Sequence, residues 1–256
     1  MLSAGEGIFR TVTHMKYGEV TDGKKLAALH DVTVVIPTRN ESENVEPLLQ
    51  RLLPLYPAAV IFVDDSDDNT AERISAFADP HVKVIHRGPG QREGGLGGAV
   101  CAGFNAATTT WVAVIDGDLQ HPPETLTALY SRALKEDNPD LVIASRYVTG
   151  GSHAGLSSTL RVAASKLGTL LVRALRRSRL RKVSDPLSGC FMLRRETVNT
   201  NSLRPEGFKI LLEILLSFED LVTADVPYTF ANRIHGSSNA NVKELFHLAR
   251  TALRRR

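Results

Sequence analysis

The chain has 256 residues, 43% of them hydrophobic and 23% charged, which fits one large folded domain or two small ones. Its formal net charge of +3 is too small to indicate nucleic-acid binding by itself. The two cysteines, Cys101 and Cys190, form no Cys-x-x-Cys pair, so the sequence argues against a disulfide scaffold and a zinc site and fits a reducing cytoplasm.

The N-terminal region, 1–30, is polar and mixed, and we expect it to be a peripheral extension. It lacks the basic stretch, apolar core and cleavage site of a signal peptide. No apolar run reaches the roughly 18–20 residues that span a bilayer, because charged residues or glycine interrupt the longest candidates, 167–175 and 210–218. We therefore expect a chain that does not cross the membrane.

From residue 31 the chain alternates between apolar runs and segments with helical spacing. The apolar, β-branched runs predict strands at 32–37, 59–65, 81–87 and 111–118. The segments between them predict helices at 45–56, 70–78 and 98–107. The strands are continuously apolar rather than alternating, which is typical of a parallel sheet covered on both faces. The sequence thus predicts an α/β fold with a mostly parallel central sheet.

Polar clusters follow three of these strands, at 37–41, 64–68 and 116–118. In open α/β sheets, ligands bind outside the carboxyl ends of the strands, so the three clusters should converge on one site. Asp116 and Asp118, with Gln120 beside them, supply the oxygen ligands that Mg²⁺ or Mn²⁺ prefers. This pattern predicts a divalent cation held against a phosphate group.

Each cluster also has a structural interpretation. Asp116 and Gly117 could form a hairpin turn, and Glu41 could be a favourable charge at a helix N-terminus. Asp64 and Asp65 could cap the helix near Thr70 or form an Asx turn. An acidic pair after a strand also occurs in phospho-accepting receiver domains. That class requires a later lysine at a strand end and a chain of about half this length.

Six ordered segments resemble the inverting family 2 glycosyltransferases, and most closely the dolichol-phosphate mannose synthase group: PTRNE (37–41), VDDSDDNT (63–70), GGLGGA (94–99), DGDLQHPP (116–123), ASRY (144–147) and DPLSG (185–189). The resemblance covers 31–240 and implies a Rossmann-like catalytic domain of the GT-A type. It implies transfer of a hexose, most simply mannose from GDP-mannose, to a polyprenyl phosphate. UDP-glucose as donor, a saccharide hydroxyl as acceptor and a catalytically silent sugar-nucleotide-binding protein are the alternatives.

The resemblance also implies roles for individual residues. Nucleotide-binding positions are Pro37, Glu41, Asp65, Asp67 and Asp116; metal ligands are Asp116, Asp118 and Gln120; catalytic positions are Asp118, Arg146, Arg161 and Arg233. Among these, Arg146 and Arg161 face the acceptor and Arg233 the phosphates. Two departures from the family pattern are Asn239 in place of a lysine and the missing lysine of the glycine-rich segment, which Arg92 could replace.

Two segments have the pattern of membrane-surface helices. The segment 156–182 has an apolar stripe and six arginines or lysines between 173 and 182, and the segment 241–256 ends in three arginines. We expect a peripheral protein on an anionic, cytoplasmic membrane face, with a separate anchor partner as an option. The alternative for 156–182 is a core helix with a solvated basic end. Nucleic acid is not expected, because the segment has no aromatic stacking residues.

Overall fold

The computed structural model describes residues 28–152, 180, 183–205 and 209–232. Most of the predicted extension lies outside these residues, as do the segment 241–256 and all of 156–182 except Leu180. Arg161, Arg233 and Asn239 also lie outside them. The predictions for these parts of the chain therefore stay predictions.

One sheet of seven strands organises the described residues, in the order β3-β2-β1-β4-β6-β5-β7. The strands are β1 (Val32–Thr38), β2 (Ala59–Asp64), β3 (Val82–His86), β4 (Trp111–Val114), β5 (Leu141–Ser145), β6 (Phe191–Arg194) and β7 (Thr223–Pro227). Neighbouring strands are parallel except at β6, which runs antiparallel to β4 and β5. The expected mostly parallel sheet is confirmed.

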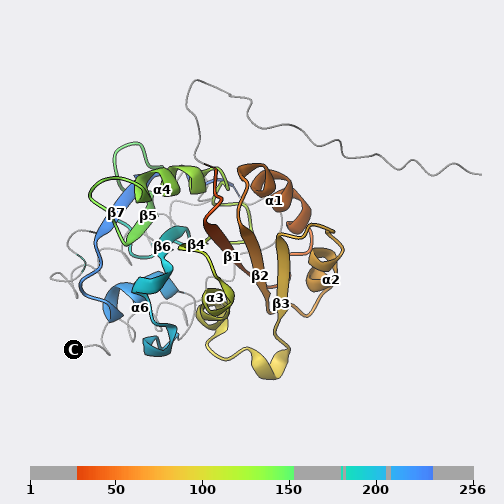
Figure 1. Cartoon of the computed structure of the whole chain (residues 1–256). Coiled ribbons are helices and arrows are strands. Elements are labelled where there is room, and N and C mark those ends of the chain that lie inside the picture. Colours follow the sequence, from red (N-terminus) through yellow and green to blue (C-terminus); the bar gives the residue numbers. More distant parts are fainter. Residues whose placement is uncertain (1–27, 153–179, 181–182, 206–208, 233–256) are drawn as a thin grey trace, which may run out of the picture.

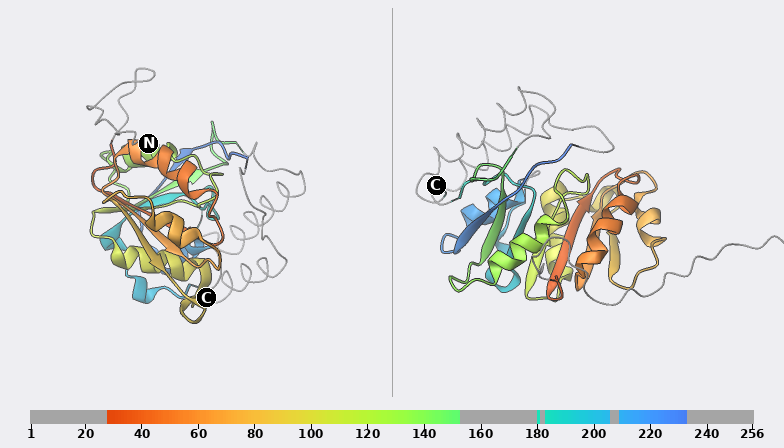
Figure 2. Two further views of the ribbon diagram at one scale, coloured as in Figure 1. Left: turned by 90° about the vertical axis from the view of Figure 1, so that its right-hand side faces the viewer. Right: turned by 90° about the horizontal axis from the view of Figure 1, so that it is seen from above.

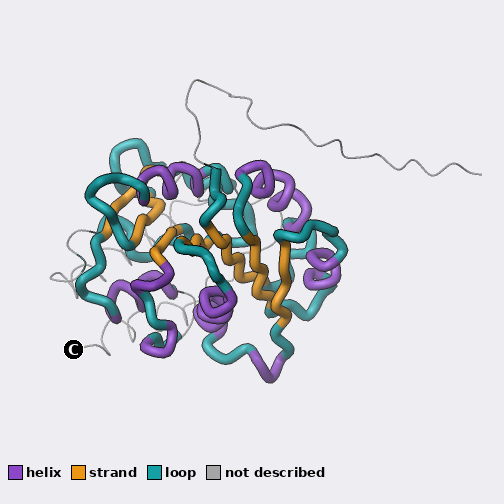
Figure 3. Tube along the Cα trace, viewed as in Figure 1, coloured by secondary structure: helices purple, strands orange, loops and turns teal. Residues whose placement is uncertain are grey.

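Helices cover both faces of the sheet, which gives three layers (Figures 1 and 2). One face carries α1 (Val45–Leu52), α2 (Thr70–Ser75) and α4 (Thr125–Ala133), and the other carries α3 (Gly95–Ala106) and α6 (Ile210–Ser217). Figure 3 shows these helices flanking the strands, with short 3-10 turns at Leu53–Leu55, Pro89–Gln91, Arg195–Thr197 and Thr200–Ser202. No helix in the described ranges is long and apolar enough to cross a membrane.

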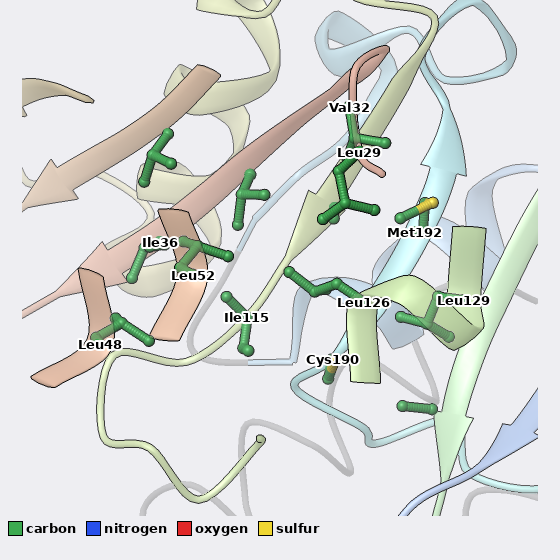
Figure 4. Packing of buried hydrophobic residues seen from close by; sticks show 14 of the residues in the cluster. Leu29, Val32, Ile36, Leu48, Leu52, Ile115, Leu126, Leu129, Cys190 and Met192 are labelled. Atoms are coloured by element: carbon green, nitrogen blue, oxygen red, sulfur yellow. The ribbon is translucent and has the colours of Figure 1, made fainter. Parts of the chain in front are cut away.

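The sheet separates two hydrophobic cores. Successive side chains of a strand point to opposite faces, so Val34 and Ile36 of β1 join the core under α1 and α4 while Val35 joins the core over α3 and α6. Figure 4 shows the first core, where leucines of α1 and α4 meet the strands. Each such fully buried aliphatic side chain contributes about 1.5–3 kcal/mol. Burial on both faces explains why the strands are continuously apolar in sequence.

The four predicted strands and three predicted helices are confirmed, but several ends differ: α1 ends at Leu52 rather than 56, α2 at Ser75 rather than 78, and β4 at Val114 rather than 118. Helix α3 begins at Gly95 rather than near 98, so most of the glycine-rich segment is helical. Close approach of the backbone explains this composition. A β-carbon at Gly98 would lie 2.0 Å from the carbonyl oxygen of Glu93, and one at Gly103 would lie 2.3 Å from Val35 Cγ1. Glycine here serves tight packing, which outweighs its poor helix propensity.

We predict that Gly103→Ala lowers the free energy of unfolding by about 1–2 kcal/mol. Alanine gains about 1 kcal/mol of helix propensity, but overpacking against the buried, β-branched Val35 costs about 1–3 kcal/mol and should win at so short a distance. Urea unfolding measures the difference. Gly90→Ala is the matched control, because a β-carbon there meets no atom within 4 Å. Equal stability of the two variants would contradict the packing account.

Candidate functional site

The carboxyl ends of the parallel strands meet at one edge of the sheet. The register aligns Thr38 of β1 with Asp64 of β2, and Asp64 with His86 of β3. Because β6 is antiparallel, its start lies at this same edge, next to the ends of β4 and β5. The polar clusters after β1, β2 and β4 therefore converge as the sequence predicts, and the 185–189 segment before β6 joins them.

Asp64 is a fully buried carboxylate that joins the first three strands. It accepts hydrogen bonds from Thr38 Oγ1 at 2.9 Å and Ser66 Oγ at 2.5 Å, and it contacts His86 Nδ1 at 2.8 Å. The backbone N–H of Thr70 donates to Asp68 Oδ1 at 3.0 Å, which forms a turn just before α2, and the N-cap residue of this helix is Asn69. The alternative that Asp64 and Asp65 cap this helix is thus wrong.

Asp65, a predicted nucleotide ligand, forms a two-pronged ion pair with Arg87. Arg87 Nε donates to Asp65 Oδ1 at 2.7 Å and Arg87 Nη2 donates to Asp65 Oδ2 at 2.6 Å. Both side chains are almost fully buried. The backbone N–H of Asp65 also donates to the carbonyl of Thr38 at 2.9 Å. Asp65 is therefore held in one orientation from two neighbouring strands.

Arg92 holds the rest of the acidic loop. Its Nη2 donates to the Ser66 carbonyl at 2.7 Å and to Asp67 Oδ1 at 2.8 Å, and this bond lowers the pKa of Asp67. Asn40, at a φ of +57°, accepts from the Asp67 N–H at 3.0 Å and donates its own N–H to Ser66 Oγ at 2.7 Å. Arg92, the candidate to replace the missing lysine, is thus engaged with the acidic loop.

Pro37 and Glu41, both predicted to bind the nucleotide, lie at the end of β1 and in the loop that follows it. Pro37 is buried and in register with Val63 of β2. The N–H of Glu41 donates to Thr70 Oγ1 at 3.1 Å, and its carboxylate accepts from the Asn44 side chain. These contacts bring the loop after β1 against the acidic loop after β2.

The segment 116–121 forms a tight loop beyond β4. Asp118 is nearly buried and accepts from the Gln120 N–H at 3.0 Å, while Leu119 adopts a positive φ of +61°. Gln120 forms two hydrogen bonds with Ala231, which follows β7. The Ala231 N–H donates to the Gln120 carbonyl at 2.8 Å, and the Gln120 side-chain amide donates to the Ala231 carbonyl at 3.5 Å. The loop is therefore fixed by its own turn and by a distant part of the chain.

Asp116 is the more exposed carboxylate of the pair, with 34% of its side chain accessible. It lies against Gly189, where a β-carbon would come within 2.2 Å of Asp116 Oδ2. Any larger residue at 189 would displace Asp116, so the glycine of DPLSG makes room for this carboxylate. The sequence signals Gly189 only as part of the family resemblance.

The donor set suits a hard cation that shares its ligands with a substrate. The described residues contain no group of three or more His, Cys, Asp or Glu side chains that could hold a metal alone. Two carboxylates, Asp116 and Asp118, and the amide of Gln120 lie on one short loop at the strand end. Mg²⁺ is commonly bound by one or two carboxylates, with phosphate oxygens and water completing its shell. The residues present fit such a cation.

Arg146, predicted to face the acceptor, directly follows β5 and forms a buried ion pair. Its Nε and Nη2 donate to the two carboxylate oxygens of Asp185 at 2.7 Å and 2.9 Å, and Asp185 is fully buried. Burial disfavours the Arg146 cation, but these bonds outweigh it and raise the pKa of Arg146. The guanidinium also lies 5.7 Å from the ring centre of Phe230. Sequence reasoning missed the role of Asp185.

His121 is buried among aromatic rings. It stacks on Tyr228 and meets the edge of Phe230, each with ring centres 5.2 Å apart. Its Nδ1 lies 3.3 Å from Asp116 Oδ2 but has no hydrogen-bond partner among the described residues. Although an ion pair with Asp116 would favour the imidazolium, burial and then the charges of Arg146 and Lys209 lower the pKa of His121 to about 3. His121 is therefore neutral at pH 7.

We predict that Asp185→Asn lowers the free energy of unfolding by about 3–5 kcal/mol, because it leaves the buried Arg146 cation without its counter-charge. Asp137→Asn is the control. Asp137 makes the same two-pronged pair with Arg132, at 2.7 Å and 2.6 Å, but with more than half of its side chain exposed. Its loss should cost about 1 kcal/mol or less. Chemical denaturation measures the free energy of unfolding of both variants. Equal losses would refute the role of Asp185 as the counter-charge of Arg146.

A family model described as Glycosyl transferase family 2 matches residues 33–200. A dolichol-phosphate mannosyltransferase of Pyrococcus furiosus is 38% identical over 224 residues, which cover 86% of this chain. The chain spans 62% of that protein's length. A dolichol-phosphate mannosyltransferase of Saccharomyces cerevisiae is 31% identical over 230 residues, covering 83% of this chain and 82% of the yeast protein.

Among solved structures, one similar chain is glucosyl-3-phosphoglycerate synthase from Mycobacterium tuberculosis, in complex with Mn²⁺, UDP-glucose and phosphoglyceric acid. The TM-score is 0.68 at 24% identity, covering 92% of this chain and 85% of that one. At this identity the likeness concerns the fold alone. Together with the mixed sheet, it supports the predicted α/β architecture of the GT-A type.

Proposed function

The chain belongs to glycosyl transferase family 2, in the dolichol-phosphate mannosyltransferase group, and we propose that it transfers mannose from GDP-mannose to a polyprenyl phosphate. It is a glycosyltransferase. The observation that carries the proposal is the meeting of the Asp116–Asp118 loop with the acidic loop after β2 at one edge of the sheet. Two carboxylates can hold a cation against a diphosphate, and a separate polar cluster can bind the base and ribose. Together they suit a nucleoside diphosphate.

On the donor side, we assign the nucleoside to the loops after β1 and β2 and the diphosphate to the loop after β4. Pro37, Glu41, Asp65 and Asp67 would contact the base and ribose. Asp116, Asp118 and Gln120 would hold Mg²⁺ or Mn²⁺, which stabilises negative charge on the departing diphosphate. The fixed turn of this loop, with the buried Asp118, supports a site that needs little rearrangement on binding.

On the acceptor side, a phosphate monoester needs no catalytic base. Its second pKa is about 6, so it is largely a dianion at neutral pH and attacks without losing a proton. A saccharide hydroxyl would need a base, and His121, a candidate for that role among the described residues, is packed between Tyr228 and Phe230 with 3% of its surface exposed. The geometry therefore favours the phosphate acceptor over the saccharide alternative.

The arginines would align the acceptor phosphate. Arg146 uses Nε and Nη2 for Asp185, and no contact of the described residues occupies its Nη1. A planar guanidinium suits this task because it binds phosphate oxygens and stays charged. We propose that Arg146, with Arg161 and Arg233, directs one phosphate oxygen at the anomeric carbon. A single in-line displacement inverts that centre.

A lipid acceptor requires a membrane surface, and we propose a peripheral enzyme on the cytoplasmic face. The basic segment 156–182 supports this, since each Lys or Arg near anionic lipid contributes about 1 kcal/mol. The basic end of 241–256 would add to this attraction. A separate membrane-anchor protein is a compatible partner.

The decisive assay follows radiolabel from GDP-mannose, and in parallel from UDP-glucose, into an organic-extractable polyprenyl phosphate, with Mn²⁺ and with EDTA. We expect label in the lipid phase from GDP-mannose alone, and at least a 100-fold loss with EDTA, because one preorganised charge contact is worth about 10²–10³ in rate. Label only from UDP-glucose would overturn the donor assignment. Label only in a water-soluble saccharide would overturn the acceptor assignment.

A further inference from the structure

Arg87 joins three segments of the candidate site, although neither its sequence context nor the family resemblance singled it out. It follows β3 and is 8% exposed. Besides its two bonds to Asp65, it donates from Nη1 to the Glu93 carbonyl at 3.2 Å and from Nη2 to the Gly95 carbonyl at 2.8 Å. Its own N–H donates to the Asp64 carbonyl at 2.8 Å. The acidic loop and the start of α3 are thus fixed to one guanidinium.

The glycine-rich segment is shaped to admit this side chain. A β-carbon at Gly98 would lie 3.0 Å from Arg87 Nη1 and would collide with the Glu93 carbonyl that Arg87 binds. Arg92 reinforces the arrangement from outside, because its Nε donates to the Arg87 carbonyl at 3.1 Å while its Nη2 binds the acidic loop. The start of α3 and Arg92 therefore hold Arg87 in place, and Arg87 holds Asp65 in turn.

The fork of Arg87 leaves Asp65 able to bind a second partner. A carboxylate offers about four acceptor positions, and Arg87 takes one on each oxygen. The remaining positions can accept from the N–H groups of a base or the hydroxyls of a ribose. An ammonium in place of the guanidinium could not hold both oxygens in one plane, because it acts as a point charge. The orientation of Asp65 thus depends on arginine specifically.

We propose that Arg87 is a positioning residue for the donor: it orients Asp65 for the nucleoside without touching the nucleotide diphosphate. This inference rests on the proposed assignment of Asp65 to the nucleoside. The proposal assigns the two halves of the donor to different residues. Arg87 should affect the binding of the nucleoside, while the Asp116–Asp118 loop binds the diphosphate. That separation gives a readout that general damage to the fold would not produce.

The test titrates the full chain with GDP, UDP and inorganic diphosphate, each with Mn²⁺, by calorimetry. In Arg87→Lys we expect the Kd of the bound nucleoside diphosphate to rise about tenfold, which corresponds to one charge-assisted hydrogen bond. The Kd of inorganic diphosphate should stay within about twofold of the wild-type value. Arg51→Lys is the matched control, because Arg51 forms the same fork with Glu124, at 3.0 Å and 2.7 Å, on the exposed surface.

A double-mutant cycle with Asp65→Asn tests whether Arg87 acts through Asp65. If it does, Arg87→Lys has no further effect once Asp65 is changed. Full additivity, or a parallel loss of nucleoside diphosphate and inorganic diphosphate binding, would overturn the proposal. Arg87→Gln is the second variant, and failure of both to melt cooperatively would assign Arg87 to folding instead. If the wild-type chain binds neither GDP nor UDP, the proposed function itself fails.

Discussion

Buried carboxylates at one edge of the sheet, among them Asp64, Asp65 and Asp185, must each have a partner, and these partners decide how the site is built. A buried unpaired charge is very costly, so each carboxylate is bound by a group from another part of the chain. Asp64 is held by Thr38 and Ser66, Asp65 by Arg87, and Asp185 by Arg146. The loops that follow the strands are thereby fixed to one another.

The acidic residues at this edge differ in their partners more than in their burial, since Asp118 is as buried as Asp65. The carboxylates with arginine or hydroxyl partners are almost wholly buried, and they position loops. Asp116 is more exposed and lies in a niche made by Gly189, next to the nearly buried Asp118. We interpret the loop of Asp116 and Asp118 as the part that meets the cation and the diphosphate. The surrounding ion pairs make its supporting frame rigid, which suits electrostatic stabilisation of a leaving group.

The sequence was informative where the chain is locally regular. The first four strands and the helices between them follow from apolar runs and helical spacing, and the convergence of their polar ends follows from parallel pairing. The later strands β5, β6 and β7 were not predicted, and nothing local shows that β6 is antiparallel.

Long-range pairing was the part of the site that the sequence could not show. Arg146 and Asp185 are 39 positions apart, and Asp65 and Arg87 are 22 apart, so no spacing rule predicts either ion pair. The cramped positions of Gly98 and Gly189 depend on side chains from other elements in the same way. Residue types and strand ends predicted where the site lies; the partners of its buried charges required the fold.

The central claim is that Asp116 and Asp118 hold a divalent cation against a nucleoside diphosphate. Electron paramagnetic resonance of Mn²⁺ tests it directly, by counting free Mn²⁺ with and without GDP in the wild-type chain and in Asp118→Asn. The account predicts that Mn²⁺ binding tightens at least tenfold when GDP is present, and that this gain disappears in the variant. Mn²⁺ binding that is unaffected by GDP, or equal in the two proteins, would contradict it.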